Sequence, residues 1–289
     1  MTASVVFGLA AALSNAVFIM TQHLASVSAP AREKGWRLAV YLLRQPLWLL
    51  GWIAAAGGFG FQALALHYGP LSVVQPLLVS ELVFALVLRR VWIHQDVARA
   101  AWGSALVTCA ALAVFLAMAE PQGGQSNPTD RAWLSVLLVF DGIIAVLALL
   151  ALRGAPIRRA ALFAIAASLT WALCATFIKA TTDTLATFGV VGMFLHWPVY
   201  ALAAAGVVGT LLQQAALHVG PLSVSQPLVV IVDPFASIVL SVWLFNETFT
   251  DSASKIAVAI VAFAVMAVGV VALSRTTPID LESSKPVRL

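Results

Sequence analysis

The stretch from Gln62 to Leu78, QALALHYGPLSVVQPLL, is nearly repeated from Gln213 to Val229, QQAALHVGPLSVSQPLV. At this offset of 151 residues, 12 of the 17 positions are identical, and the identities include His, Gly, Ser, Gln and two Pro. A chance match between apolar segments would repeat Leu, Val and Ala, not this polar and helix-breaking set. The chain therefore contains a duplicated unit, and duplication within a membrane protein is the usual plan of a secondary transporter.

The composition predicts a membrane protein. Hydrophobic residues make up 62% of the chain and charged residues 10%, whereas a soluble domain carries about 25% charged residues. A membrane span needs about 20 apolar residues, and no Lys or Arg precedes the first apolar stretch, which indicates a retained span and not a cleaved signal peptide. The nine expected spans are 4–25, 45–66, 70–92, 99–119, 132–152, 159–181, 193–217, 221–245 and 253–274.

The basic residues predict the orientation of these spans. If the N-terminus lies outside, the loops and tail on the cytoplasmic side hold 13 of the 16 Lys and Arg residues. This asymmetry favours nine spans in the plasma membrane, with the N-terminus out and the C-terminus in. Lys179 lies within the sixth span, where we expect its side chain to snorkel outward. The outer loops hold Arg131, Lys255, Glu120, Asp130, Glu247 and Asp251.

The two halves are predicted to be inverted relative to each other. FGLAAALSNA from Phe7 resembles FAIAASLTWA from Phe163, so spans 1–4 correspond to spans 6–9. Residues 1–119 then form the first repeat and residues 159–274 the second, while 120–158 carry the unrepeated fifth span and 275–289 form a polar cytoplasmic tail. One intervening span reverses the direction of the second half. The expected fold is an all-α polytopic membrane protein with an inverted repeat.

The repeated segment carries a resemblance to a known family. YLLRQPLWLLGW at 41–52, followed by GGFGFQALALHYGPLSVVQPLLV at 57–79, resembles the second and third spans of the drug/metabolite transporter superfamily, with its EamA-like and NIPA-like branches. NIPA-like members, associated with magnesium transport, carry an acid after the glycine of the second span in a G-E-x-x-N-F pattern. Here Phe59 follows Gly58, so the resemblance implies an organic solute somewhat more than magnesium.

Each half places a proline about two turns into its third span, Pro76 in the first half and Pro227 in the second. A proline inside a helix removes one hydrogen bond and displaces a carbonyl, and irregular backbone at membrane depth survives only within protein or beside a wet cavity. We therefore predict two broken helices facing a central cavity formed by spans 1, 3, 6 and 8; a pair of packing kinks is the alternative. The candidate substrate contacts are Asn15, Ser72, Gln75, Ser223 and Gln226.

Three carboxylates lie near the middle of spans: Glu81, Asp233 and Asp141. A charge at that depth costs at least about 2.5 kcal/mol, so we expect these acids to couple protons or bind a cation. The alternative is a structural hydrogen bond made by a protonated acid. Glu81 and Asp233 differ by one residue in the repeat register, about 100° around a helix, so the spacing does not require that they face the same cavity.

Two histidines, His67 and His218, occupy the same place in the repeat. Because histidine titrates near neutral pH, they are candidates for a proton-linked gate together with Pro76 and Pro227; polar caps on helix ends are the alternative. No two histidines have a metal-ligand spacing, and we expect no metal site or cofactor. Cys109 and Cys174 lie inside apolar segments, which argues against a disulfide or a zinc site.

The sequence favours a secondary-active transporter that moves a small organic solute by alternating access. A NIPA-like transporter of magnesium is the second hypothesis, and a membrane scaffold that transports nothing is the third. The phosphate-binding pattern G-x-x-x-x-G-K-[ST] is absent, so ATP does not drive the chain directly, and no nucleophile–base arrangement indicates an enzyme. The expected partners are the solute or ion and the lipid bilayer, with no nucleic acid, and a homodimer is compatible with the sequence.

Overall fold

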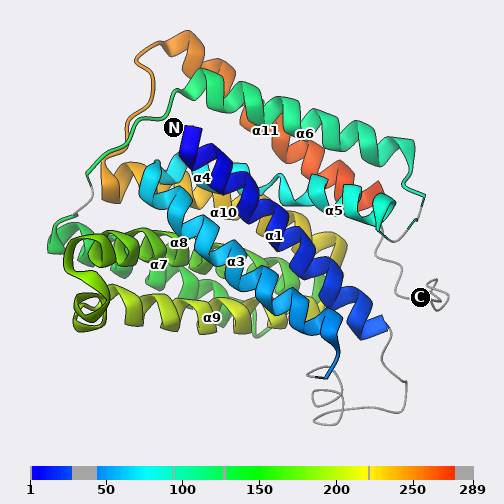
Figure 1. The fold of residues 1–289 in the computed structure, drawn as a ribbon, viewed down its shortest axis with the longest axis horizontal. Coiled ribbons are helices and arrows are strands. Elements are labelled where there is room, and N and C mark those ends of the chain that lie inside the picture. The colour runs from blue at the N-terminus through cyan, green and yellow to red at the C-terminus, as the bar shows by residue number, and fades with distance from the viewer. Residues whose placement is uncertain are drawn as a thin grey trace.

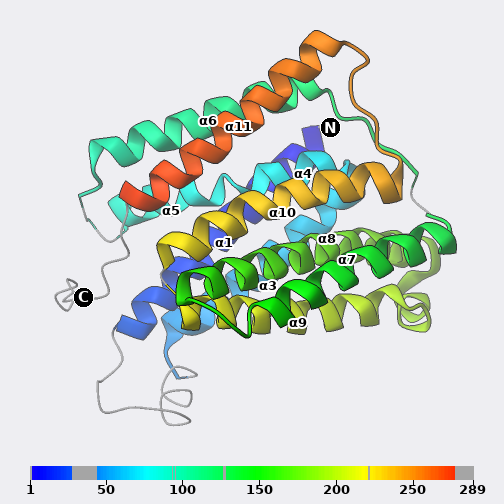
Figure 2. The same ribbon diagram turned by 180° about the vertical axis from the view of Figure 1, so that it is seen from behind.

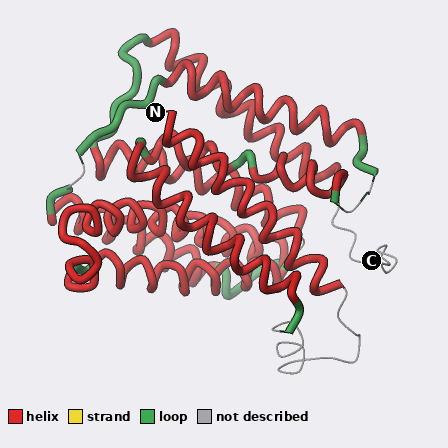
Figure 3. Tube along the Cα trace, in the orientation of Figure 1, coloured by secondary structure: helices red, strands yellow, loops and turns green. Residues whose placement is uncertain are grey.

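The computed structural model describes residues 2–27, 44–92, 94, 96–125, 128–220 and 222–276, without the side chains of His23, Ser26, Val27, Leu222, Ser223, Arg275 and Thr276. In these residues the chain is helical apart from its connecting loops (Figure 3). The helices, labelled in Figure 1, are α1 (Thr2–Val27), α3 (Pro46–Tyr68), α4 (Leu71–Leu78), α5 (Glu81–Val91), α6 (Arg99–Ala119), α7 (Asp130–Leu150), α8 (Pro156–Leu195), α9 (Pro198–Val219), α10 (Leu222–Phe245) and α11 (Ala253–Thr276).

Within the described residues, nine helical segments are long and apolar enough to cross a membrane, with α4 and α5 together forming one of them. This confirms the expected number of spans for that part of the chain. The largest difference in boundaries is at α8, a helix of 40 residues that continues well past the predicted end at residue 181. It bends at Gly189 (φ 69°, ψ −175°), a left-handed backbone conformation that glycine adopts at little cost.

The helices form one bundle, and α1 begins and α11 ends at opposite ends of it (Figures 1 and 2). We call these the amino end and the carboxy end. Helices α6 and α11 lie along one side of the bundle, α7 and α9 lie along the opposite side, and α10 runs between them (Figure 2). The most extensive helix pairs are α1 with α3, α8 with α9 and α6 with α11.

Glycines at equivalent places let the first two of these pairs approach closely. A Cβ atom on Gly58 of α3 would lie 2.7 Å from Oδ1 of Asn15 and 3.2 Å from Cβ of Ser14 on α1. A Cβ atom on Gly209 of α9, which is 151 residues further along, would lie 3.2 Å from the ring of Trp171 on α8. Small residues at such crossings permit tight packing of membrane helices. The residues that the sequence pairs between the halves therefore make equivalent contacts.

The predicted break in the third span is present. The helix ends after Leu78 and resumes at Glu81, one turn beyond Pro76. At the break the Ser80 N–H donates to the Leu77 carbonyl at 3.1 Å, as in a 3₁₀ turn, and the Ser80 hydroxyl donates to the same carbonyl at 2.7 Å. The Leu77 carbonyl therefore accepts both bonds from Ser80 at the point where the helix is interrupted.

The predicted break in the eighth span is wrong. Helix α10 continues from Leu222 to Phe245 through both Pro227 and Pro234. The position equivalent to Ser80 is Ile231, whose side chain has no hydroxyl to bind a backbone carbonyl. Proline by itself removes one hydrogen bond, and in α10 that loss does not divide the helix.

Candidate functional site

Two carboxylates from the two halves of the chain lie near each other in the bundle. Glu81 is the first residue of α5, so the break before it places the carboxylate at a helix N-terminus, where partial positive charge favours an anion. Asp233 of α10 lies close enough to Glu81 for the two charges to interact. Both residues are intermediate in exposure.

Further polar groups surround the carboxylate pair formed by Glu81 and Asp233. The Asn15 side chain on α1 hydrogen-bonds Glu81, and the Ser237 hydroxyl donates to Oδ1 of Asp233 at 3.3 Å. Cys174 of α8 is close enough to Asp233 for an electrostatic interaction between the two side chains. None of these neighbours is basic, so in the described part of the chain no positive charge balances the pair. Helices α1, α5, α8 and α10 correspond to the four spans that the sequence placed around the site.

The candidate substrate contacts lie in different environments. Gln75 on α4 is 2% exposed, and its amide nitrogen has no hydrogen-bond partner among the described residues. Gln226 is partly exposed. Ser72 is buried and its hydroxyl already donates to Glu247 at 2.7 Å, so it is committed to a structural bond. The side chain of Ser223 lies outside the described residues.

The third carboxylate, Asp141, is not brought to the pair. Helix α7 buries Trp133, Val136, Phe140 and Ile144 against the bundle, and Asp141 lies on its exposed side. The two candidate gating histidines are both exposed at helix ends. His67 lies 3.8 Å from Oδ1 of Asp183 on α8, measured from its Nδ1 atom, and it also contacts the ring of Tyr68.

A buried acid far away in the sequence holds the turn between α3 and α4. Glu247, which follows α10, is 2% exposed. One carboxylate oxygen accepts from the Leu71 N–H at 2.7 Å, and the other accepts from the Ser72 N–H at 3.0 Å and from its hydroxyl. The first amides of a helix have no partner within the helix, and an anion there is favoured by the helix dipole. Glu247 therefore caps α4 from the opposite half of the chain.

A lysine holds the other side of the same turn. The ammonium of Lys179 on α8 donates to the Leu66 carbonyl at 3.1 Å and to the Gly69 carbonyl at 3.5 Å. It also lies 5.4 Å from the centre of the Phe245 ring, within the range of a cation–π contact. The predicted outward snorkelling of Lys179 is therefore wrong, because the free carbonyls at the end of α3 bind a cation. We call Lys179 and Glu247 the amino-end clasp.

The loop that carries Glu247 is fixed by a second loop, which joins α6 to α7. Gln122 and Thr248 form an isolated antiparallel bridge, with N–H to carbonyl distances of 2.9 and 3.4 Å. The Gln125 N–H donates to the Phe245 carbonyl at 2.7 Å. A Cβ atom on Gly124 would overlap the Phe245 carbonyl, so only glycine allows this approach. We call residues 119–125 the strap.

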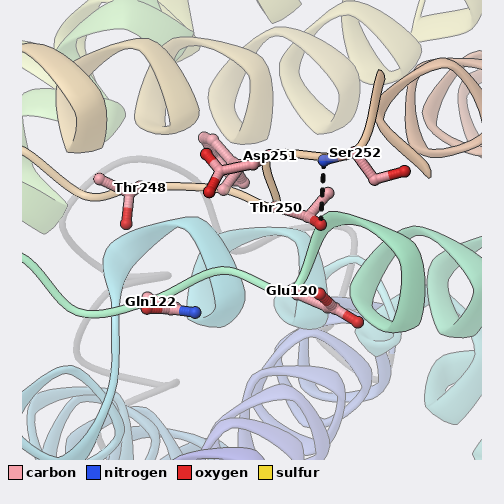
Figure 4. A pocket seen from close by; sticks show the side chains of 7 residues that line it. Glu120, Gln122, Thr248, Thr250, Asp251 and Ser252 are labelled. Carbon is pink, nitrogen blue, oxygen red and sulfur yellow. Dashed lines mark hydrogen bonds between the residues drawn. The ribbon is translucent and has the colours of Figure 1, made fainter. Parts of the chain in front are cut away.

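Figure 4 shows the strap beside the loop from Thr248 to Ser252. A shallow polar pocket of about 500 Å³ lies between them, lined by Glu120, Gln122 and residues 248–252. Lys255 donates to Glu120 at 2.5 Å, and this bond lowers the pKa of the Glu120 carboxyl below its ordinary value. The pocket is open and its acid is already paired, so we assign the strap a structural role.

Of the two clasp residues, the sequence singled out Lys179 but not Glu247. Glu247 was placed in an outer loop with the exposed acids, and Asp183 was not singled out. One sequence signal does point to Glu247: the repeat continues beyond Val229, since VWIHQD at 91–96 aligns with VWLFNE at 242–247 at the same offset of 151. An acid retained at the end of both copies indicates a position with a specific role.

Comparison with known proteins identifies a relative but no family. The chain is similar to an uncharacterized protein of Corynebacterium glutamicum, with 28% identity over 284 residues that cover 98% of each chain. No family model matches the chain. No solved structure matches it.

Proposed function

We propose that the protein is a secondary-active membrane transporter that moves a small organic solute by alternating access, with the pair Glu81 and Asp233 coupling transport to protons or to a cation. The observation that carries the proposal is this pair of acids. Charged groups inside a membrane protein are expensive and usually mark the path of a substrate or proton. Here the described neighbours leave both acids without a basic partner, so a proton or a cationic group has to balance them.

The architecture supports a transporter in two further ways. The duplicated halves supply equivalent helices to the site, and many transporters place the substrate between such repeats, near helices that are discontinuous. The break between α4 and α5 lies directly at Glu81. The resemblance of residues 41–79 to the drug/metabolite transporter superfamily agrees with this proposal, and the inverted, N-out arrangement in the plasma membrane is part of it.

The donor set favours an organic solute over magnesium. Within the described residues, no three His, Cys, Asp or Glu side chains gather as a metal site would require. A divalent cation would find two carboxylates and the Asn15 amide, whereas magnesium demands near-octahedral oxygen coordination. An organic solute needs only a few well-placed polar groups in an apolar surrounding, and the few uncharged neighbours of the pair, Asn15, Ser237 and Cys174, suit that requirement.

The test uses the purified protein in liposomes that contain a pH-sensitive dye. A panel of amines, amino acids and aromatic cations is added outside, with and without an imposed proton gradient. We expect at least one solute to drive protein-dependent proton movement, and Glu81→Gln or Asp233→Asn to reduce the initial rate at least tenfold. Asp141→Asn is the matched variant, an acid at similar depth on the exposed side of α7, and it should retain most of the rate.

Two outcomes would contradict the proposal. A magnesium step that produces a protein-dependent signal in a magnesium-sensitive dye, lost in Glu81→Gln, would establish cation transport in place of the organic solute. If correctly inserted protein moves neither solutes nor magnesium, and the double variant Glu81→Gln, Asp233→Asn behaves like the wild type in every assay, the protein is a scaffold and not a transporter.

A further inference from the structure

The amino-end clasp has a counterpart in the first half of the chain. At the offset of 151 that defines the repeat, Glu247 corresponds to Asp96, and the capped residues Leu71 and Ser72 correspond to Leu222 and Ser223, the first two residues of α10. Asp96 and Glu247 therefore occupy the same place in the repeat, just after the third and the eighth span.

The two acids are in opposite environments. Glu247 is buried and bonded to the start of α4. The side chain of Asp96 is 96% exposed and pairs with Arg90 at 2.5 Å, so in this conformation it does not cap α10. At the amino end, Glu247 therefore caps a helix, while at the carboxy end the equivalent Asp96 pairs with Arg90 and caps none of the described helices. Nothing in the duplicated sequence requires this difference, because Asp and Glu both cap helices.

We propose that Glu247 and Asp96 are matched gate residues that alternate between two conformations of the protein. In the conformation described here, Glu247 holds α10 to the start of α4 and closes the amino end. In the opposite conformation, Asp96 leaves Arg90 and caps the start of α10 at Leu222 and Ser223, while Glu247 releases α4. The proposal deepens the transport function proposed above and rests on it, because alternating access requires each end to close in turn.

The geometry explains why such a clasp acts as a gate. Glu247 lies two residues beyond the end of α10 and binds the first residues of α4, so its three hydrogen bonds join the third and eighth spans, which carry the acid pair on α5 and α10. Opening the amino end separates these helices and exposes the amides of Leu71 and Ser72. To cap α10 at the carboxy end, Asp96 has to break its exposed ion pair with Arg90. Exposed ion pairs contribute little to stability, so this step costs little. The two conformations therefore differ mainly in whether the start of α4 or the start of α10 is capped.

The experiment is hydrogen–deuterium exchange of the full chain in lipid nanodiscs, without any solute. In Glu247→Gln we expect the amides of Leu71 and Ser72 to exchange at least about tenfold faster, as for loss of bonds to a buried charged group. The start of α10 should become more protected in the same variant. Asp96→Asn alone should not speed the exchange of the Leu71 and Ser72 amides of α4. In the double variant with Glu247→Gln, it should remove the added protection at the start of α10. Asp251→Asn, an exposed acid in the same loop as Glu247, should leave both regions unchanged.

Asp96 is exposed, so we expect its variants to fold. The test can therefore still be made if Glu247→Gln is poorly folded. In that case Glu247→Asp, which retains the charge but shortens the reach, replaces it. The proposal is overturned if the start of α10 gains no protection when the Glu247 clasp is weakened, or if Asp96→Asn leaves that gain intact. Because no solute is present, opposite changes at α4 and α10 would support the gate even if no transport were found, and the transport proposal would then fail alone.

Discussion

Replacement of Glu247 by Gln is a sensitive test of the amino-end clasp, because the geometry of the site defines what the amide cannot do. In the wild type both carboxylate oxygens accept backbone N–H groups, one from Leu71 and one from Ser72. An amide keeps one oxygen and presents an NH₂ group at the other position. Whichever way it turns, one buried N–H faces another donor and loses its partner.

The magnitude follows from these contacts. Leaving a buried donor without a partner costs about 1–3 kcal/mol. Loss of the anion at the start of α4 adds about 0.3–1 kcal/mol, because the helix dipole no longer meets a negative charge. We expect Glu247→Gln to lower the free energy of unfolding by about 1–4 kcal/mol, since the two effects act together.

The assay is reversible unfolding of the purified protein in mixed micelles, followed by circular dichroism. Asp251→Asn removes a carboxylate from the same loop, where it is exposed, and should stay within about 0.5 kcal/mol of the wild type. If Glu247→Gln also stays within that range, the carboxylate does not cap α4 as described. The assignment of a clasp would then have to be abandoned.

Three further predictions concern the surroundings of the clasp. Gly124→Ala places a Cβ atom on the Phe245 carbonyl. In the same unfolding assay it should destabilise the protein by about 1–3 kcal/mol, as overpacking does. An unchanged stability would mean that the strap does not pack against Phe245 as described. Lys179→Met should cost about 1–3 kcal/mol through the unpaired carbonyl of Leu66, and a value near zero would show that the ammonium is dispensable. The bond from Lys255 lowers the pKa of the Glu120 carboxyl. The stabilisation from this bond is therefore present above the ordinary pKa of 4.5 and is lost as the pH falls through the lower pKa of the folded state. The stability difference between the wild type and Glu120→Gln should disappear between pH 7 and pH 3, and a difference that stays constant over this range would contradict the assignment.

The spans could be predicted from the sequence because they depend on quantities that are local. The length and apolarity of each segment fix the nine spans found within the described residues, and Pro76 indicated the break in the third span. The helix starts were less exact, since the seventh span was expected from residue 193 and α9 begins at Pro198, where proline fits the first turn without losing a bond. The unbroken α10 was missed because a proline removes one hydrogen bond and does not by itself divide a helix.

The candidate site was only partly predictable, because it depends on which side of each helix faces the bundle. In a helix that is apolar all round, hydrophobic periodicity gives no direction, so the meeting of Glu81 and Asp233 and the outward position of Asp141 were left open. The cap on α4 joins residues 175 and 176 positions apart, a separation at which no local pattern reports contact. Lys179 was misassigned for the same reason, since its partners are backbone carbonyls on another helix.

The strap bears on how this protein can be handled in the laboratory. The stretch between the fourth and fifth spans is where a reporter or affinity tag would ordinarily be inserted, because loop tips tolerate insertions. Here Gln122 and Gln125 bond to the loop that positions Glu247, so an insertion at 119–125 would disturb a helix cap in the other half. The turn at Arg153 and Gly154, between α7 and α8, is exposed and is the better place to lengthen the chain or to divide it into two co-expressed polypeptides.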